Sequence, residues 1–243
     1  MEASPTLLTG AWRDLALLSW RAEAALLVPR LPRGTELDRF EGDCYLSVVA
    51  LRFLDLALLG LPVPLHQEFA QVNLRFYVRR TVNGEVRRGA VFLRELVPRP
   101  VIVAGARLLM NEPFVGARVE AQITTSGEGA AGRLRADYRW QVEGRAGSLW
   151  LHAEAPSAPL PPGSGEEFIA ERCWGYTPQP HGGTLEYRVQ HPRWRVRPGA
   201  AAGLEGELEA AFGAEFAELL RHAPDHAFYA EGSEVGMRAP GRI

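Results

Sequence analysis

The sequence predicts a β-rich α+β protein with mostly antiparallel strands and a few peripheral helices. The clearest strand is Val72–Val82, where apolar and polar side chains alternate as in a strand with one buried face. Asn83-Gly84 follows it and indicates a tight hairpin, because both central residues of a type I′ turn need positive φ. Glycine-containing turns at 127–132 and 144–147 separate three further strands, which extends the antiparallel pattern.

The remaining elements follow from periodicity and from helix-breaking residues. After an amphipathic stretch that begins at residue 12, a short helix is expected over Ala22–Val28, where Pro29 and Pro32 stop it. β-branched and aromatic residues or alternation predict strands at Tyr45–Phe53, Glu85–Leu96, Ala117–Thr125, Arg133–Val142, Ser148–Glu154, Thr184–Gln190, Trp194–Arg197 and Phe228–Met237. Helical spacing of apolar residues predicts further helices at Arg99–Leu109, Glu166–Arg172 and Leu204–Leu220.

We expect one domain over residues 1–243, with a Pro/Gly/Ser-rich connector at 155–165 as the expected internal boundary. The net charge of −2 gives no reason to expect a nucleic-acid or membrane partner. No run reaches the 18 or so apolar residues of a membrane span. Two distant cysteines, Cys44 and Cys173, fit free thiols in a reducing compartment, so a cytoplasmic protein is expected.

All 27 basic residues are arginine, and the chain has no lysine. A lysine amine can lose its proton in a desolvated pocket and attack a carbonyl, whereas a guanidinium stays charged. Chemistry through a lysine imine is therefore excluded.

Two apparent motifs carry no site. Residues 127–132 match G-x-G-x-x-G, but the segment that follows alternates as a strand, so we interpret them as a hairpin loop rather than a dinucleotide site. His222 and His226 have i, i+4 spacing, but Pro224 breaks the helix that would align them. The sequence thus predicts no metal and no cofactor.

Four arginines, Arg79, Arg80, Arg87 and Arg88, flank the Asn83-Gly84 turn. Arginine binds phosphate or carboxylate in bidentate fashion, so an anion or acidic-partner site is one interpretation. We favour the other, a solvated strand edge that discourages pairing with other chains.

Polar residues within apolar strands are the more informative candidates. Asn73, Arg75 and Tyr77 share one strand face, and Glu95 lies in the next strand, close enough to predict a charge pair with Arg75. A later segment adds four further candidates: Glu171, Arg172, Tyr176 and His191.

Were these residues to meet inside the fold, Arg75 and Arg172 would form an anion clamp. The candidate proton-transfer groups would then be Glu95, Glu171, Tyr176 and His191. The alternative is that the same residues form salt bridges that pin strands and helix ends without binding a substrate.

Four segments, 28–49, 69–80, 89–114 and 168–194, together resemble the uncharacterised YqjF-like family, also called DUF2071. The most specific parts are N-x-R-x-Y-V at 73–78 and the E-R…Y…H-P-x-W series at 171–194. This family belongs to the acetoacetate decarboxylase-like superfamily. The resemblance implies a closed or cone-shaped antiparallel β-barrel with peripheral helices and a small interior cavity.

In acetoacetate decarboxylases the reactive lysine follows a Gly-aromatic-Pro segment. The similar segment here is 110–114, so the resemblance places Phe114 where that lysine would be. Phe114 is then expected to line the pocket as an apolar wall. The family supplies no catalytic residues to carry over, and fold alone does not define a function.

Three functions remain open. The first is a binding protein for a small acidic or oxo-acid-like ligand, with Asn73, Arg75, Tyr77, Arg172 and Phe114 as ligand-binding residues. The second is a lysine-independent lyase, hydratase or isomerase acting on a small oxo-acid. The third is a non-catalytic structural or interaction protein. A binder requires a cavity of roughly 300 Å³ or more with an arginine inside it. The sequence leaves a homo-oligomer open.

Overall fold

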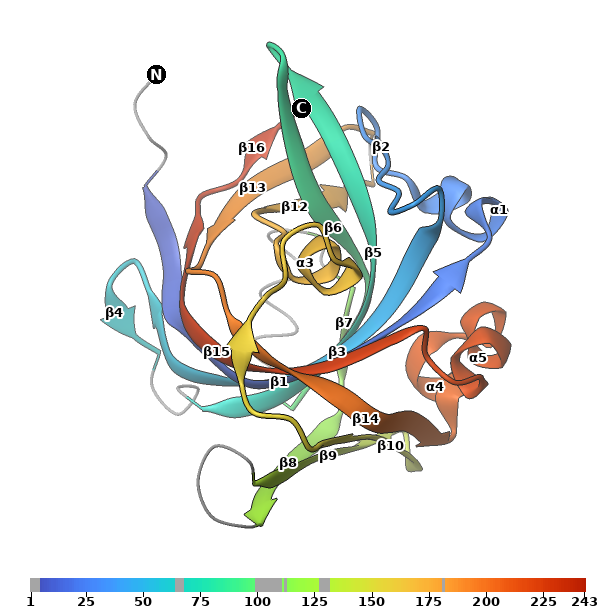
Figure 1. The fold of residues 1–243 in the computed structure, drawn as a ribbon. Helices are drawn as coiled ribbons and strands as arrows, with labels where there is room; N and C mark the ends of the chain where they lie inside the picture. Colours follow the sequence, from blue (N-terminus) through green and yellow to red (C-terminus); the bar gives the residue numbers. More distant parts are fainter. Residues whose placement is uncertain (1–4, 64–67, 99–110, 112, 127–131, 181) are drawn as a thin grey trace.

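The computed structural model describes residues 5–63, 68–98, 111, 113–126, 132–180 and 182–243. Its central feature is a sheet of seven strands that closes into a ring (Figure 1). Around the ring these are β13 (Thr184–Gln190), β12 (Trp174–Pro178), β6 (Glu85–Val97), β5 (Phe69–Val82), β3 (Cys44–Leu58), β1 (Thr6–Ala22) and β15 (His226–Arg238). A short ladder between β13 and β15 completes it, with Val189 opposite Met237 and Gln190 opposite Gly236. The structure confirms the β-rich fold class.

A second sheet lies against the outside of the ring, at the bottom of Figure 1. Its strands are β14 (Arg195–Gly206), β10 (Arg145–Ala153), β9 (Arg133–Val142) and β8 (Arg118–Ser126), and β14 joins it to the ring by pairing with β15. Five short strands complete the sheets: β2 (Glu36–Leu37), β4 (Leu61–Pro62), β7 (Phe114–Gly116), β11 (Ala158–Pro159) and β16 (Gly241–Arg242).

The described helices are short. They are α1 (Ala24–Leu27) with the 3₁₀ turn η1 (Val28–Arg30), α3 (Gly165–Ala170), α4 (Leu208–Phe212) and α5 (Ala214–Arg221). Helix α3 lies across one end of the ring, and its Phe168 and Ile169 pack into the interior (Figure 1). Ser164 caps α3, since its Oγ accepts a hydrogen bond from the Glu167 amide at 3.1 Å.

The closed ring divides the buried apolar residues into an outer core and an inner core. Alternate residues of each strand point to opposite faces, so one set packs outward against the second sheet and the other packs inward. On β5 the outward set includes Leu74 and Phe76, whereas Phe69 and Tyr77 belong to the inner core. The turn after β5 is the predicted hairpin, with φ of 51° at Asn83 and 83° at Gly84.

Several boundaries differ from the sequence expectations. Strand β1 was not recognised because its residues 15–20 are all buried, which removes the alternation of a half-exposed strand. Strand β12 is short and ends at Pro178, so its pattern is weak. The helix predicted from Leu204 was wrong at its start: residues 204–206 extend β14, and Gly213, with φ of 98°, separates α4 from α5. The helix predicted at 99–109 and most of the glycine loop at 127–132 lie outside the described residues.

Asp14 joins the ring to the second sheet. It sits at an irregularity of β1 with φ of 57°, and its carboxylate accepts hydrogen bonds from Tyr229 Oη at 2.6 Å and Arg52 Nη1 at 3.0 Å. Its carbonyl oxygen accepts a third from Tyr138 Oη on β9. Burial, together with the Asp14 carboxylate, raises the pKa of Tyr229 well above its ordinary value, so this phenol remains a donor.

We predict that Asp14→Ala lowers the free energy of unfolding by about 2–4 kcal/mol, because it leaves a buried phenol unpaired and forces positive φ on alanine. Asp55→Ala is the matched control, since Asp55 is an exposed aspartate with φ of 53° and tests the backbone effect alone. Urea unfolding of both variants measures the difference. Equal losses would show that the side chain of Asp14 contributes nothing beyond its backbone conformation.

Candidate functional site

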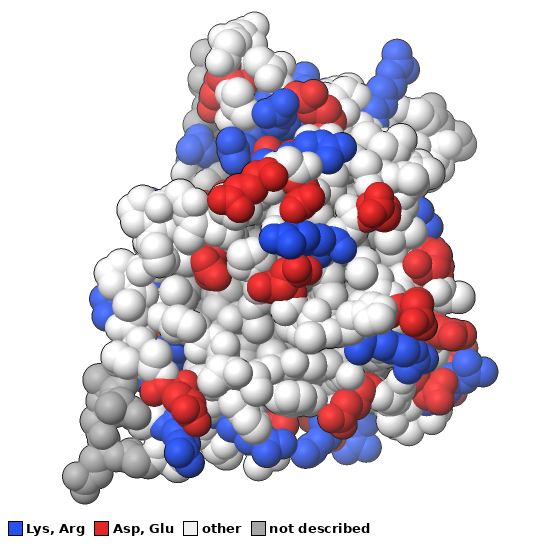
Figure 2. Space-filling view, turned by 45° about the vertical axis from the view of Figure 1, so that its right-hand side comes forward, with Lys and Arg blue, Asp and Glu red and all other residues white. Residues whose placement is uncertain are grey.

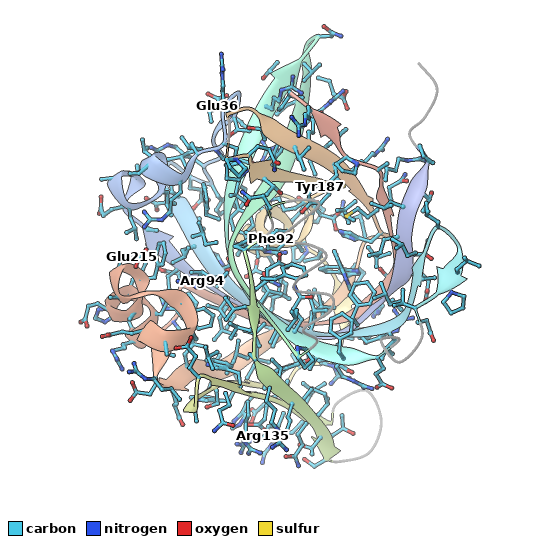
Figure 3. All side chains as sticks on the ribbon, turned by 180° about the vertical axis from the view of Figure 1, so that it is seen from behind. Glu36, Phe92, Arg94, Arg135, Tyr187 and Glu215 are labelled. Atoms are coloured by element: carbon cyan, nitrogen blue, oxygen red, sulfur yellow. The ribbon has the colours of Figure 1, made fainter. Side chains whose placement is uncertain are left out.

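The interior of the ring holds a cavity of about 220 Å³. Ring strands supply most of its wall, with Phe114 from β7 and Trp194 from the loop before β14. Most lining side chains are apolar: Leu8, Trp12, Leu15, Leu51, Phe53, Leu56, Phe69, Phe92, Val97, Phe114, Val189, Trp194, Val235 and Met237. Figure 3 shows Phe92 and Tyr187, which also lines the cavity, on the inside of the ring, with Arg94, Arg135 and Glu215 outside it.

The polar part of the wall comes from two neighbouring strands. Gln71, Asn73 and Arg75 of β5 and Glu95 of β6 all line the cavity. On β5 this follows from the two-residue period, because Leu74 and Phe76 take the outward positions and leave the odd-numbered residues inside. The predicted shared face of Asn73 and Arg75 is therefore the inner face.

A β-bulge in β6 brings Glu95 to the same wall. Leu74 pairs with Arg94 but Arg75 pairs with Phe92, so Leu93 is an extra residue in β6. Without the bulge, Phe92 and Glu95 are three residues apart and point to opposite faces. With it, both face the cavity, and Glu95 lies directly opposite Asn73.

Arg75 is the buried cation of this wall. Only 8% of the residue is exposed, its Nη2 donates a long 3.4 Å hydrogen bond to the Ile169 carbonyl, and its Nε has no partner. The guanidinium carbon lies 5.7 Å from the centre of the Tyr77 ring. Within the described part of the chain, no carboxylate oxygen comes within 4.0 Å of this guanidinium. The predicted charge pair with Glu95 was wrong, because the bulge sets Glu95 opposite Asn73 instead.

The Glu95 carboxylate accepts a 2.6 Å hydrogen bond from Gln71 Nε2, and the residue is 5% exposed. Beside it, the buried Asn73 Oδ1 has no hydrogen-bond partner. A buried amide oxygen without a partner is costly, and a ligand or water that donates to it removes the cost. The wall therefore presents a guanidinium, an amide and a carboxylate to one apolar space.

Phe114 lies in the cavity wall because β7 runs parallel to β6, with Phe114 opposite Glu95. This is the position that the resemblance assigned to a reactive lysine. The Phe114 ring adds an apolar surface to the cavity wall next to the Glu95 carboxylate.

The lining residues that sequence reasoning missed include Trp12, Gln71, Tyr187 and Trp194. Gln71 could have been found, because it shares the two-residue period of Asn73 and Arg75. Tyr187 alternates with Val189 on β13, and its ring lies on Gly175, where an added Cβ would be 2.1 Å from Tyr187 Cζ. Trp12 was missed with strand β1.

Arg172 lies elsewhere, so it forms no clamp with Arg75 in the cavity. It is 5% exposed and donates to Asp38 Oδ2 at 2.5 Å, with its guanidinium carbon 3.9 Å from the centre of the Phe168 ring. Burial lowers the pKa of Arg172 to about 10 despite the opposing effect of Asp38. Arg172 follows α3 and lines a groove on the outer side of that helix.

The other candidate proton-transfer groups are also absent from the cavity wall. Glu171 lines the outer groove, and Tyr176 belongs to the outward core because Gly175 takes the inward position on β12. Burial raises the pKa of Tyr176 well above its ordinary value. His191 stacks on Trp194 at 4.4 Å and interacts with the Pro192 carbonyl. Of the polar residues predicted to meet inside the fold, only Asn73 and Arg75 of β5 and Glu95 of β6 line the cavity.

Tyr77 points inward but beyond the cavity lining. Its Oη donates to Ser47 Oγ at 2.7 Å, and Ser47 Oγ lies 2.6 Å from Ser19 Oγ. This buried chain fixes three ring strands to one another. Tyr77 thus contacts the Arg75 guanidinium with its ring rather than facing the cavity with its hydroxyl.

The arginines of the β5–β6 hairpin all have carboxylate partners. Arg79 pairs with Glu36, and Arg88 lies 3.5 Å from Asp38. Glu186 on β13 accepts from Arg80 at 3.0 Å and from Arg87 at 2.7 Å. These pairs tie the hairpin to neighbouring segments and place a carboxylate beside each of its four arginines. On the face in Figure 2, acidic and basic groups lie beside one another in the same way.

Two other site classes find no support in the described residues. These residues contain no group of three or more His, Cys, Asp or Glu placed to hold a metal ion. None of the described helices is long and apolar enough to cross a membrane.

The ring, the helix across its end and the interior cavity define the acetoacetate decarboxylase-like fold, which three solved structures share. Enduracididine biosynthesis enzyme MppR, complexed with the condensation product of pyruvate and imidazole 4-carboxaldehyde, superposes with a TM-score of 0.68 at 14% identity, covering 99% of this chain and 90% of that one. An acetoacetate decarboxylase-like enzyme from Sphingomonas wittichii RW1 gives 0.65 at 16% identity, with 98% and 94% covered. Acetoacetate decarboxylase from Legionella pneumophila gives 0.65 at 12%, with 100% and 90% covered. At these identities the similarity establishes the fold alone.

Within that fold class, the chain belongs to the DUF2071 family, described as an uncharacterized conserved protein, which matches residues 9–234. This confirms the family inferred from the sequence motifs. A curated relative, uncharacterized protein YqjF of Bacillus subtilis (strain 168), is 28% identical over 112 residues, which are 46% of this chain and 45% of the relative. The match thus spans less than half the length of that relative.

One hydrogen-bonded pair beside α3 makes the stability of that helix depend on pH. Glu166 Oε1 lies 3.3 Å from His226 Nδ1, and the hydrogen bond from His226 lowers the pKa of Glu166 from 4.5 to about 2. Because the folded-state pKa is depressed, the stabilisation is present above pH 4.5 and is lost as pH falls toward 2.

We predict that Glu166→Gln destabilises the protein above pH 4.5, and that wild type and variant converge as pH falls toward 2. The difference is about 1 kcal/mol at most, since the carboxylate is partly exposed and screened by water. Urea unfolding across this pH range measures it. A difference that stays constant would show that the pair does not stabilise α3 through its charge.

Proposed function

We propose that this protein binds a small, largely apolar ligand that carries a carboxylate, and that the ligand sits inside the ring with its carboxylate on Arg75. The observation that carries the proposal is a buried guanidinium in an apolar cavity with no carboxylate oxygen within 4.0 Å among the described residues. A buried charge that lacks a counter-charge is destabilising, and a carboxylate ligand supplies one with bidentate geometry.

The volume of the cavity limits the size of the ligand. At about 220 Å³ it falls short of the roughly 300 Å³ that the sequence analysis required of a binding protein, so the ligand must be smaller than a drug-sized one. It corresponds to about seven waters, or to roughly ten close-packed non-hydrogen atoms. Asn73 and Arg75 would bind the polar head, and Phe114 with the neighbouring aromatic side chains would enclose the apolar part. The ligand is therefore metabolite-sized, which supports a small acid rather than a peptide or nucleic acid.

A second candidate function is lysine-independent chemistry on a small oxo-acid. The observation that favours it is that Glu95 and Tyr187 both line the cavity, so a carboxylate base and a phenol share the space with Arg75. The solved complex of MppR holds a pyruvate condensation product in the same fold. A purely structural role is less well supported, because the ring encloses a cavity and Arg75 is not committed to a salt bridge with any described residue.

We predict that Arg75→Ala abolishes binding of 4-methyl-2-oxopentanoate and 4-methylpentanoate while changing the free energy of unfolding by less than about 1 kcal/mol, because Arg75 has one long hydrogen bond to lose. Arg172→Ala is the contrasting control and is expected to cost about 3–5 kcal/mol, since it removes the buried donor to Asp38 and leaves that buried carboxylate only the exposed Arg88, 3.5 Å away. Calorimetric titration and urea unfolding measure the two effects. Binding that survives Arg75→Ala would overturn the proposal.

The catalytic alternative has its own test. In D₂O, wild-type protein that acts as a base should exchange the C3 protons of 4-methyl-2-oxopentanoate, as followed by NMR, and Glu95→Gln should not. Borohydride added to the same mixture should give no side-chain adduct by mass spectrometry, because the chain has no lysine. Binding without exchange would leave the protein a binder alone.

A further inference from the structure

The order of polar and apolar groups along β5 specifies the ligand more narrowly than its charge does. We propose that the cavity recognises a 3-hydroxy acid with a short apolar tail, whose carboxylate binds Arg75 and whose hydroxyl donates a hydrogen bond to Asn73 Oδ1. This inference rests on the proposed function, because it adds a hydroxyl group to the acid that Arg75 binds.

An acceptor without a donor is the first observation. Asn73 is 2% exposed and lines the cavity, and its buried Oδ1 has no hydrogen-bond partner. A buried carbonyl oxygen has lost its hydration, which is destabilising unless a donor is supplied. A ligand hydroxyl is an uncharged O–H donor, so it satisfies this oxygen without changing the charge of the cavity.

The two neighbouring donors on the same face of β5 are the second observation, because both are directed elsewhere. Gln71 Nε2 donates to a carboxylate of β6 at 2.6 Å. Arg75 Nη2 donates to the Ile169 carbonyl at 3.4 Å, and its guanidinium carbon lies 5.7 Å from the centre of the Tyr77 ring. Tyr77 is two residues further along the strand, so the guanidinium leans away from Asn73. These two side chains therefore leave the Asn73 oxygen to a group inside the cavity.

The sequence of groups along the strand is the third observation. One wall of the cavity is lined, in order along β5, by Arg75, Asn73, Gln71 and Phe69. Alternate residues of a strand are roughly 7 Å apart. Phe69 stacks on Phe53 at the apolar end, with ring centres 5.4 Å apart. A ligand that lies along this wall meets a cation first, then amide groups and finally aromatic rings. A 3-hydroxy acid carries its carboxylate, hydroxyl and alkyl tail in the same order.

The position of the hydroxyl on the ligand follows from the direction of Arg75. Because the guanidinium leans toward Tyr77, the carboxylate that it binds lies at the same end of the cavity. A hydroxyl at C2 stays beside the carboxylate oxygens, whereas one at C3 lies a carbon further along the wall toward Asn73. The cavity of about 220 Å³ holds roughly ten non-hydrogen atoms, and 3-hydroxyhexanoate is of this size.

The test compares four acids with the same six-carbon chain by calorimetric titration: hexanoate, 2-hydroxyhexanoate, 3-hydroxyhexanoate and 3-methoxyhexanoate, with enantiomers measured separately. One enantiomer of 3-hydroxyhexanoate is expected to bind wild-type protein at least about tenfold more tightly than the other three acids, because only it carries a donor at C3. The methoxy compound keeps the oxygen but has no O–H, so binding as tight as that of the hydroxy acid would overturn the inference. Equal or tighter binding of 2-hydroxyhexanoate would overturn it as well.

Asn73→Leu removes the acceptor and keeps a side chain of similar size. This variant should bind 3-hydroxyhexanoate no more tightly than hexanoate, so the preference is lost while hexanoate still binds Arg75. A purely structural role of Asn73 would change both affinities together. Gln190→Leu is the matched control, since Gln190 is an exposed amide on β13 and its loss should leave the preference intact. A preference that survives Asn73→Leu would also refute the inference.

The outcomes separate the two proposals. If hexanoate and 3-hydroxyhexanoate bind equally through Arg75, the hydroxy-acid inference fails and the proposed function stands. If none of the four acids binds wild-type protein, both fail. If Asn73→Leu does not fold, the preference of the wild-type protein for 3-hydroxyhexanoate over 3-methoxyhexanoate still decides.

Discussion

Closure of the sheet into a ring is the constraint on which the rest of the structure depends. An open sheet can leave one face of each strand in water, but a closed ring must enclose one face of every strand. On β5 the outward face is fully apolar and packs against the second sheet, so the enclosed face is the one that carries Gln71, Asn73 and Arg75. The polar wall of the cavity is therefore a consequence of ring closure together with the outer core.

Arg75 differs from the hairpin arginines and from Arg172, the other buried arginine among the described residues. The hairpin arginines pair with carboxylates on neighbouring segments, and buried Arg172 pairs with Asp38. In these cases opposite charges tie together segments that are far apart in sequence. Arg75 instead has a carbonyl at 3.4 Å and the ring of Tyr77. These contacts are weaker than an ion pair, so the buried charge of Arg75 is not balanced by any described carboxylate within 4.0 Å.

The sequence predicts the local features well and the long-range ones poorly. The alternation of β5 and the Asn83-Gly84 turn are local signals, and both were confirmed. The shared face of Asn73 and Arg75 was also correct, but a two-residue period cannot say which face is enclosed. The bulge at Leu93 left no signal, although it decides that Glu95 lines the cavity and faces Asn73. Arg172 pairs with Asp38, which is 134 residues away in the sequence. The sequence therefore could not distinguish an anion clamp with Arg75 from a salt bridge with Asp38.

The absence of lysine matters most inside the cavity, where the buried cation is an arginine. A lysine inside an apolar ring can shed its charge by losing a proton, so it tolerates a pocket without a ligand and becomes a nucleophile. Arg75 cannot lose its charge in this way, because a guanidinium stays protonated. The cavity must therefore hold a permanent positive charge close to an ionisable carboxylic acid, Glu95, without a direct ion pair between them. Under the proposed function, the carboxylate of a ligand supplies the counter-charge that Arg75 lacks among the described residues. The register that the bulge of β6 imposes is thus what places Glu95 opposite Asn73 and leaves Arg75 without a direct ion pair to it.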